Sequence, residues 1–370
     1  MYRLRKKTEA IREFIIEKVD AEARDLVSST TNEFGITRQA VHRHIRQLAD
    51  RKILARTASG QYQLCPLEEW QKIITVADNP REDVLWRVEV RARIGPLPEN
   101  VVNIWHYGFT EMFNNVVDHS GSSDVLLHIR RTALSTEMVV YDHGIGIFNK
   151  IKTEMGLLDE RHAVLELTKG KLTTDPDKHT GEGIFFTSRM FDTFGILSSG
   201  VFLSHTYGDN EDWILETQEE RSGTLISMKL RNDTPRVMKD IFDQYTSGDD
   251  YGFTKTVVPV RLARYGDELL VSRSQAKRLL ERVDRFKTVL LDFTGVESIG
   301  QAFADELFRV FPHEHPEVNI VEIKATRAVT DMINRARRNT FTAPGTQGEL
   351  FGNREARKDK PEEGSEDLTS

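Results

Sequence analysis

The sequence predicts a multidomain α+β protein with three parts in succession. The first 65 residues are basic and show helical periodicity, which two short strand-like segments follow. A central stretch places glycine-rich turns directly after strand-like runs, where a ligand can approach the backbone. From about Tyr251 onward, short strands alternate with helices, as in a small α/β layer. A chain of 370 residues has room for two to three such domains.

The composition excludes several classes of protein. Hydrophobic residues make up 38% and charged residues 29% of the chain, which is ordinary for a soluble protein. No apolar run approaches the roughly 20 residues that span a bilayer. The first residues lack the apolar core of a signal peptide. Cys65 is the single cysteine, so no internal disulfide can form. We expect a cytoplasmic protein with no membrane partner.

The net charge of −7 is unevenly distributed. Residues 1–65 contain 13 Lys and Arg against 8 Asp and Glu, a net charge of +5, so the remainder is strongly acidic. This asymmetry argues against nucleic-acid affinity of the whole chain and predicts a distinct N-terminal module over residues 1–65.

Three helices are predicted in this module. Thr8 can cap the first helix, Gly35 ends the second, and Thr37 caps the third. Their expected bounds are 8–19, 21–34 and 38–52. The third helix has an apolar stripe formed by Val41, Ile45 and Leu48.

Two short strands, 53–56 and 61–64, follow with a tight turn at 58–60. The sequence FGITRQAVHRHIRQLADRKIL, followed by GQYQL, resembles bacterial winged helix-turn-helix regulators. In that fold the third helix enters the major groove. The resemblance implies DNA contact within residues 37–60 through Arg38, Gln39, His42, Arg43, Arg46 and Arg56. Because winged helices also serve as protein-interaction modules, that alternative stays open.

Residues 66–94 are predicted to be a linker. Trp70, Ile73, Ile74 and Val76 suggest a connecting helix that Pro80 breaks. Residues 83–93 alternate poorly and fit either an edge strand or a helix. Gly95 and Pro96 mark the entry to the central domain, which we expect over residues 95–235.

The central domain contains the stretch EMFNNVVDH, residues 111–119. On a helix that advances about 100° per residue, Glu111, Asn115 and Asp118 fall within roughly 40° of one line, opposite an apolar side. An amide oxygen suits a hard divalent cation that carries phosphates, and a neighbouring carboxylate can position a water. Taken alone, the pattern also fits an amphipathic helix with a solvated polar face.

Three later stretches favour a ligand site. The strands 125–131 and 138–141 lead to Asp142-His-Gly144-Ile-Gly146, an acid at a strand end followed by two glycines. A second glycine turn, His179-Thr-Gly181-Glu-Gly183, opens a predicted helix over 184–194, whose free N–H groups favour an anion. Finally, Gly223 and Thr224 precede an alternating strand over 225–230.

This ordered set resembles the GHKL ATP-binding superfamily, which includes gyrase B, mismatch-repair ATPases, sensor histidine kinases and anti-sigma serine kinases. The resemblance covers roughly residues 95–232 and implies an α/β sandwich with helices on one face of a mixed sheet. The implied cofactors are ATP and Mg²⁺. The chain has no GxxxxGK[ST] motif, so a P-loop does not compete as an explanation.

The resemblance also implies roles. Glu111 would be the general base, Asn115 would hold Mg²⁺, and Asp142 would accept from the adenine amino group. A lid would lie over residues 153–180. The other implied nucleotide-binding residues are Asp118, Gly144, Gly146, Thr180, Gly181, Gly183 and Thr224. A histidine autokinase is not favoured, because no long helical pair precedes the domain and His106 lies on the same predicted helix as Glu111.

The third domain is expected over residues 250–340. Its predicted strands are 256–262, 288–293 and 319–323, and its predicted helices run from Ser272 or Ser274 to Val283, over 301–311 and over 329–337. The segment TVLLDFTGVESIGQAFADELFRVF resembles STAS-like domains related to anti-sigma-factor antagonists. The phosphorylated serine of those domains is absent near Gln301, and Ser298 lies about three residues early. We therefore expect a domain that binds an unidentified protein partner, followed by a disordered tail over 341–370.

Three functions fit these patterns. The first is an ATP-dependent DNA-binding regulator, which could be a homodimer. The second is a serine/threonine kinase of the anti-sigma type that acts on a partner in trans. The third is an ATP-sensing scaffold that does not hydrolyse nucleotide, although such a binder gains little from a base at Glu111.

Overall fold

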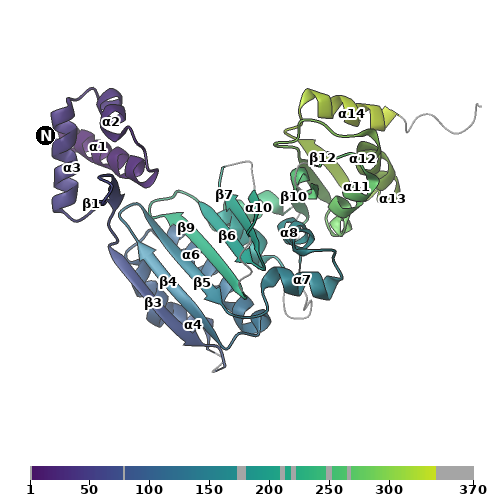
Figure 1. The fold of residues 1–370 in the computed structure, drawn as a ribbon, viewed down its shortest axis with the longest axis horizontal. Coiled ribbons are helices and arrows are strands. Elements are labelled where there is room, and N and C mark those ends of the chain that lie inside the picture. The colour runs from purple at the N-terminus through teal and green to yellow at the C-terminus, as the bar shows by residue number, and fades with distance from the viewer. Residues whose placement is uncertain are drawn as a thin grey trace, which may run out of the picture.

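The computed structural model describes residues 2–77, 80–172, 181–208, 213–217, 222–246, 252–264 and 268–338. The predicted tail over 341–370 lies outside these residues. Figure 1 shows a helical N-terminal module and a small C-terminal domain at opposite ends of a large central sheet. The three parts therefore follow the predicted order along the chain.

The N-terminal module consists of three helices and a two-stranded antiparallel sheet. Thr37 caps the third helix as expected, because its hydroxyl accepts a hydrogen bond from the Ala40 N–H. Gly35 ends the second helix with φ 59°. The first helix starts before Thr8, and the second starts later than predicted. The elements are α1 (Tyr2–Asp20), α2 (Leu26–Phe34), α3 (Arg38–Asp50), β1 (Leu54–Arg56) and β2 (Tyr62–Leu64).

The segment that was predicted to be a linker belongs to the central domain. The expected connecting helix is wrong, because β3 (Glu68–Thr75) is an edge strand that pairs with β4 along its whole length. Residues 82–94 form a helical segment whose buried Trp86 and Val90 join the central core. This segment consists of α4 (Glu82–Leu85), the π-helical turn η1 (Trp86–Val90) and α5 (Arg91–Ile94).

The central sheet has seven strands in the order β3-β4-β5-β9-β6-β7-β8. Every neighbouring pair is antiparallel, so the expected mixed sheet is wrong. The predicted helix over 184–194 ends at Met190, because Phe191 is extended and Phe194 lies in a strand. The remaining strands are β4 (Asp124–Arg131), β5 (Ser135–Asp142), β6 (Thr193–Ser198), β7 (Val201–Thr206), β8 (Trp213–Glu216) and β9 (Thr224–Arg231).

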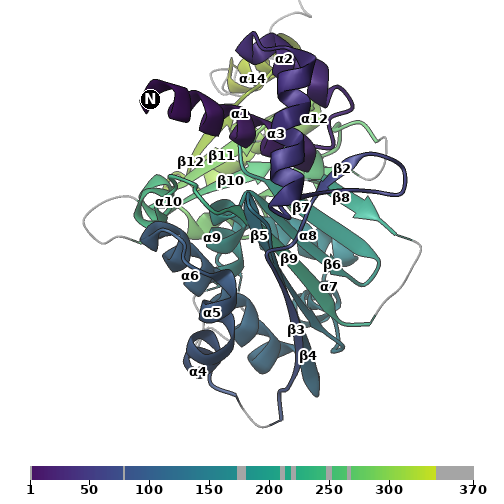
Figure 2. The same ribbon diagram turned by 90° about the vertical axis from the view of Figure 1, so that its left-hand side faces the viewer.

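Helices cover one face of this sheet, as expected, and Figure 2 shows α4, α5 and α6 on one side of it. Alternate strand residues such as Met138 and Met228 are fully buried and share a core with Trp105 and Phe109 of α6. The helices of this domain are α6 (Glu99–Asn115), the π-helical turn η2 (Val116–Ser120), α7 (Ile147–Met155), α8 (Glu160–Lys169), α9 (Gly183–Met190) and α10 (Met238–Tyr245).

The C-terminal domain packs helices around a three-stranded parallel sheet, β10-β11-β12. Ser272, one of the two predicted caps, forms a capping box with Gln275 at the start of α11. The elements are β10 (Lys255–Pro259), η3 (Val260–Ala263), α11 (Arg273–Leu280), η4 (Val283–Arg285), β11 (Thr288–Asp292), α12 (Gln301–Asp305), η5 (Glu306–Val310), α13 (Phe311–Glu314), β12 (Asn319–Ile323) and α14 (Arg327–Arg338).

Candidate functional site

A cavity of about 270 Å³ lies in the central domain between α6, α7, α9 and the adjoining ends of β5 and β9. This volume is close to the lower end of the range for small-molecule sites. Seven of the residues singled out from the sequence line it: Glu111, Asn115, Asp142, Gly146, Gly181, Gly183 and Thr224. The cavity thus collects residues from all four sequence motifs. Thr180, another residue that the resemblance assigned to nucleotide binding, lies outside the described residues.

The last turn of the α6 region changes which side chains face the cavity. Glu111 and Asn115 line it, but Asp118 is exposed and does not. The predicted shared face is wrong at this position because residues 116–120 form a π-helical turn, which contains about one residue more than an α-helical turn. The extra residue places His119 in the cavity lining instead.

Asp142 and Thr224 are directly paired across β5 and β9. Asp142 is 2% exposed, and its Oδ1 accepts a hydrogen bond of 2.8 Å from the Gly144 N–H. The Thr224 hydroxyl accepts one of 2.9 Å from the Ile147 N–H at the start of α7. Gly144 does not line the cavity, but it holds the acid in place. The register therefore fixes a carboxylate and a hydroxyl side by side.

Burial raises the pKa of the Asp142 carboxyl group, although hydrogen bonds from the Gly144 and Thr224 backbone N–H groups oppose this effect. Burial also raises the pKa of the Glu182 carboxyl group, and the positive charge of Lys171 partly opposes this rise. Tyr107 lies one turn before Glu111 on α6. Its hydroxyl has a raised pKa, mainly because it is buried and also because of the charges of Glu111 and Glu182. Tyr107 stays protonated and available as a donor across the physiological range.

Two glycines are required by close contacts around the cavity. At Gly183, the first residue of α9, a Cβ atom would lie 1.8 Å from Glu111 Oε2. The Glu111 carboxylate therefore packs against the amino end of a helix, where backbone N–H groups favour negative charge. At Gly146 the backbone has φ 80°, and a Cβ would lie 2.7 Å from Ser198 Oγ.

Sequence reasoning missed a basic side chain in the cavity. Lys150 lines the cavity, and its Nζ donates to the backbone oxygen of His119 at 3.3 Å and lies 3.4 Å from His119 Nδ1. The signal was present in the sequence, since Lys150 follows Gly146 by one helical turn and α7 starts directly after the Asp-x-Gly-x-Gly turn. A cation at this position adds to the attraction for an anionic ligand.

The predicted lid over residues 153–180 is only partly a loop. Its described part contains α8, in which every residue from His162 to Lys169 is buried. Lys169 Nζ donates to the backbone oxygens of Arg278 and Glu281 at the end of α11. Helix α8 is thus fixed to the C-terminal domain, so its ten residues do not form a hinged loop.

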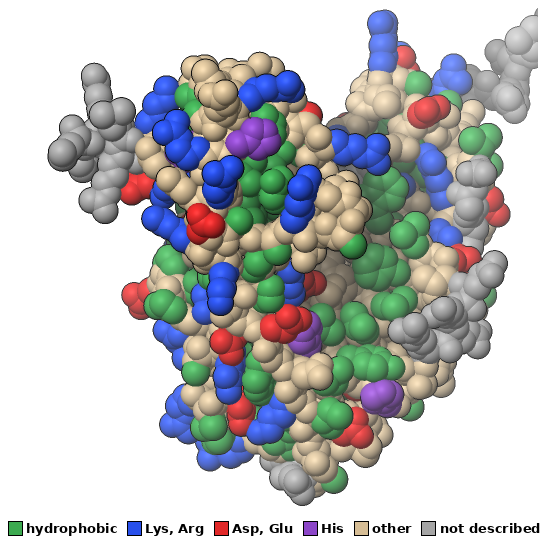
Figure 3. All heavy atoms as spheres, turned by 60° about the vertical axis from the view of Figure 1, so that its left-hand side comes forward, with side chains coloured by type: hydrophobic (Ala, Val, Ile, Leu, Met, Phe, Trp, Pro, Cys, Tyr) green, Lys and Arg blue, Asp and Glu red, His purple; other side chains and the backbone are tan. Residues whose placement is uncertain are grey.

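The side chains predicted to contact DNA lie on the surface of the N-terminal module. All five on α3 are exposed, opposite the buried Val41, Ile45 and Leu48. Arg56 is also exposed, and its Nε donates to the Gly60 backbone oxygen in the turn between β1 and β2. Figure 3 shows Lys and Arg side chains gathered over this module. The five side chains on α3 are Arg38, Gln39, His42, Arg43 and Arg46.

Comparison with known proteins bears on the C-terminal domain. Residues 275–328 match the family model of a STAS-like domain of unknown function (DUF4325). The C-terminal domain is STAS-like, which confirms that prediction. A search of curated proteins found no match to the chain. None of the helices in the described stretches has the length and apolar character to cross a bilayer.

The STAS-like domain has no serine at the start of α12. Gly300 is the N-cap of that helix and Gln301 its first residue, while Ser298 is exposed in the preceding loop. Ser298 therefore lies outside helix α12.

Proposed function

We propose that the chain is a GHKL-type regulator that binds and hydrolyses Mg·ATP and couples nucleotide state to DNA binding through an N-terminal winged helix-turn-helix. The observation that carries this proposal is the convergence of Glu111, Asn115, Asp142 and Thr224 on one cavity with two glycine turns. These residues lie on three separate elements, α6, β5 and β9, and an amphipathic helix with a solvated polar face gives no reason for their meeting.

In this proposal the Asp142 carboxylate accepts a hydrogen bond from the adenine amino group, and Thr224 lies beside it on the neighbouring strand. Glu111 acts as general base toward the attacking water. Asn115 provides an amide oxygen for Mg²⁺, and Lys150 and the amino end of α9 favour the phosphates. The donor set fits the group, because a hard cation prefers oxygen ligands and Mg²⁺ is held by few protein side chains. Bound Mg²⁺ would neutralise charge on the phosphates.

The expected effect of Gly183→Ala follows from the contact with Glu111. A Cβ at this position overlaps Glu111 Oε2, so the carboxylate must move away from the amino end of α9. A displaced base should lower the ATP turnover rate by about 10- to 100-fold, while a change one turn later, Thr187→Ser, should have little effect. Steady-state phosphate release measures both variants. A wild-type rate for Gly183→Ala would contradict the assigned position of the base.

Strand β9 supports the proposed coupling, because it runs from the cavity toward the N-terminal module. It begins with Thr224 at the cavity, and Lys229 and Arg231 lie five and seven residues further on, roughly 17 and 23 Å away at about 3.3 Å per residue. There Lys229 pairs with Asp20 at 2.9 Å and Arg231 with Glu17 at 2.7 Å, both on α1. Nucleotide would shift the N-terminal module only to the extent that it binds one arrangement of these parts more tightly.

The DNA-binding part of the proposal predicts a salt-dependent effect. The double variant Arg43→Ala/Arg46→Ala should weaken DNA binding and reduce the slope of log K against log salt by about 2, because two phosphate contacts are lost. ATP affinity should not change. Fluorescence anisotropy at several salt concentrations measures the slope.

A matched control is Arg81→Ala/Arg87→Ala, which removes the same charge from exposed side chains around α4. Equal DNA binding by the Arg43/Arg46 variant and the wild type would assign the module to protein contacts instead.

The reaction class is tested by incubating the purified chain with γ-labelled ATP, with and without a cell extract. Release of free phosphate supports hydrolysis. Label on another protein supports the second candidate, a kinase acting in trans, which the absence of a serine at the start of α12 favours over a kinase acting within the chain. Bound ATP that is neither hydrolysed nor transferred would identify a nucleotide-sensing scaffold.

A further inference from the structure

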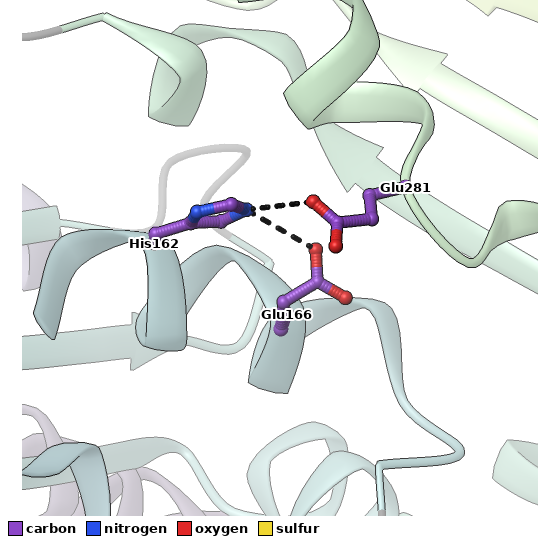
Figure 4. A group of neighbouring side chains, drawn as sticks. All are labelled: His162, Glu166 and Glu281. Carbon is purple, nitrogen blue, oxygen red and sulfur yellow. Dashed lines mark ion pairs between the residues drawn. The ribbon is translucent and has the colours of Figure 1, made fainter. Parts of the chain in front are cut away.

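A histidine and two glutamates meet where the central domain contacts the STAS-like domain. His162 and Glu166 lie one turn apart on α8, and Glu281 follows the last turn of α11 (Figure 4). His162 Nε2 lies 3.1 Å from Glu281 Oε2 and 3.8 Å from Glu166 Oε1. One potential ligand atom from each residue lies within 4.8 Å of the others. None of the three lines the nucleotide cavity.

The imidazole of His162 is buried without a hydrogen bond. Its residue is 6% exposed, and neither Nδ1 nor Nε2 makes a hydrogen bond to any described residue. Glu281 Oε2 is within 3.1 Å but lacks hydrogen-bond alignment. A buried polar atom without a partner is costly, so such a group calls for a ligand or a proton. Figure 4 shows the Nε2 side of the ring turned toward both carboxylates.

Charged side chains surround the imidazole. Glu166 is 2% exposed and pairs with Lys169, whose Nζ lies 2.5 Å from Glu166 Oε1. Lys169 therefore compensates the charge of Glu166, while the partly exposed Glu281 carboxylate lies 3.1 Å from the imidazole. Lys169 also bonds the Arg278 and Glu281 backbone oxygens, so it holds both helices in place around the cluster. Partners of this kind orient the ligands of a metal ion.

The two distances from the imidazole are close to those between the ligands of a tetrahedral zinc ion. Two ligands bonded to Zn²⁺ at about 2.0–2.2 Å lie roughly 3.3–3.6 Å apart, and the two distances from His162 Nε2 bracket this range. An imidazole nitrogen favours Zn²⁺ over Mg²⁺ or Ca²⁺, which prefer oxygen. We propose that His162, Glu166 and Glu281 bind one Zn²⁺ that joins α8 to the STAS-like domain, with a water at the fourth position.

This site would have a consequence for the neighbouring cavity. Leu167, which follows Glu166 on α8, lines the nucleotide cavity. A metal ion bound at both domains would fix α8 between the cavity and α11. The proposal does not depend on ATP binding, since the metal can be measured without nucleotide.

The test is a Zn²⁺ titration of the full chain, without nucleotide and with excess Mg²⁺, followed by competition with a chromogenic chelator. The wild type should bind one Zn²⁺ per chain. His162→Ala and Glu281→Gln should each lower the affinity by at least about 100-fold, because loss of a ligand exceeds the 10- to 100-fold effect of a supporting residue. Glu281 is partly exposed, so its variant keeps the test sound if His162→Ala fails to fold.

The matched control is His313→Ala, which removes an exposed histidine from α13 and should bind Zn²⁺ like the wild type. Co²⁺ in place of Zn²⁺ should give visible d–d bands of a four-coordinate site in the wild type and His313→Ala only. Absence of one-to-one binding by the wild type, or equal binding by all variants, would overturn the proposal.

Discussion

Asp142→Asn should lower the affinity for ATP by at least about 100-fold, or ~2.8 kcal/mol. The substitution keeps the size of the side chain, but the amide oxygen carries no full negative charge and is a weaker acceptor for a hydrogen bond from the adenine amino group. It also perturbs the bond from the Gly144 N–H, which now fixes the carboxylate. Isothermal titration calorimetry with ATP and Mg²⁺ measures the loss. The neighbouring Asp124→Asn removes a carboxylate that does not line the cavity and should bind like the wild type.

The Asp142→Asn substitution should not destabilise the fold. Because burial raises the folded-state pKa of Asp142, the native chain binds a proton there more tightly than the unfolded chain does. The ionised carboxylate therefore costs stability, and this cost grows as the pH rises above the unfolded value. A neutral Asn avoids the cost, so thermal unfolding at pH 7 should occur at the same or a higher temperature. A clearly lower transition temperature would mean that lost affinity reflects damage to the fold.

Glu111→Gln should reduce the rate of ATP hydrolysis by about 10²- to 10⁴-fold, the usual range for a general base. Binding of ATP should remain within a few-fold of the wild type, because the glutamine keeps the shape that packs against Gly183. Single-turnover phosphate release and calorimetry together separate the two effects. Glu99→Gln, an exposed residue at the start of the same helix, serves as the control. Wild-type hydrolysis by Glu111→Gln would remove the base from its assigned role.

Local chemistry made part of this structure predictable. The Thr37 cap, the Gly35 stop and the buried stripe on α3 depend on a few neighbouring residues, and the structure has all three. The cavity residues were also recognisable, because glycines and acids at strand ends carry a specific spacing. The resemblance implied that Asp142 and Thr224 both bind the nucleotide, and the antiparallel register of β5 and β9 places them opposite one another.

Other features depend on partners that lie far away in the sequence. The apolar residues of 70–76 fit a helix in isolation, but pairing with β4 makes them an edge strand in which only Ile74 is buried. The π-helical turn after Asn115 changes which side of the helix the following side chains face, and no residue between 116 and 120 predicts such a turn. The ionic cluster between α8 and α11 joins residues more than a hundred positions apart, so it becomes visible only in the fold.

Nucleotide binding itself is measured by calorimetry of the wild-type chain with ATP at saturating Mg²⁺. We expect one molecule of ATP per chain, bound in the cavity that Glu111, Asn115 and Asp142 line, with the heat of binding lost in Asp142→Asn. If the wild-type chain binds no adenine nucleotide under these conditions, the cavity serves another ligand and the proposed ATP-driven regulator is wrong.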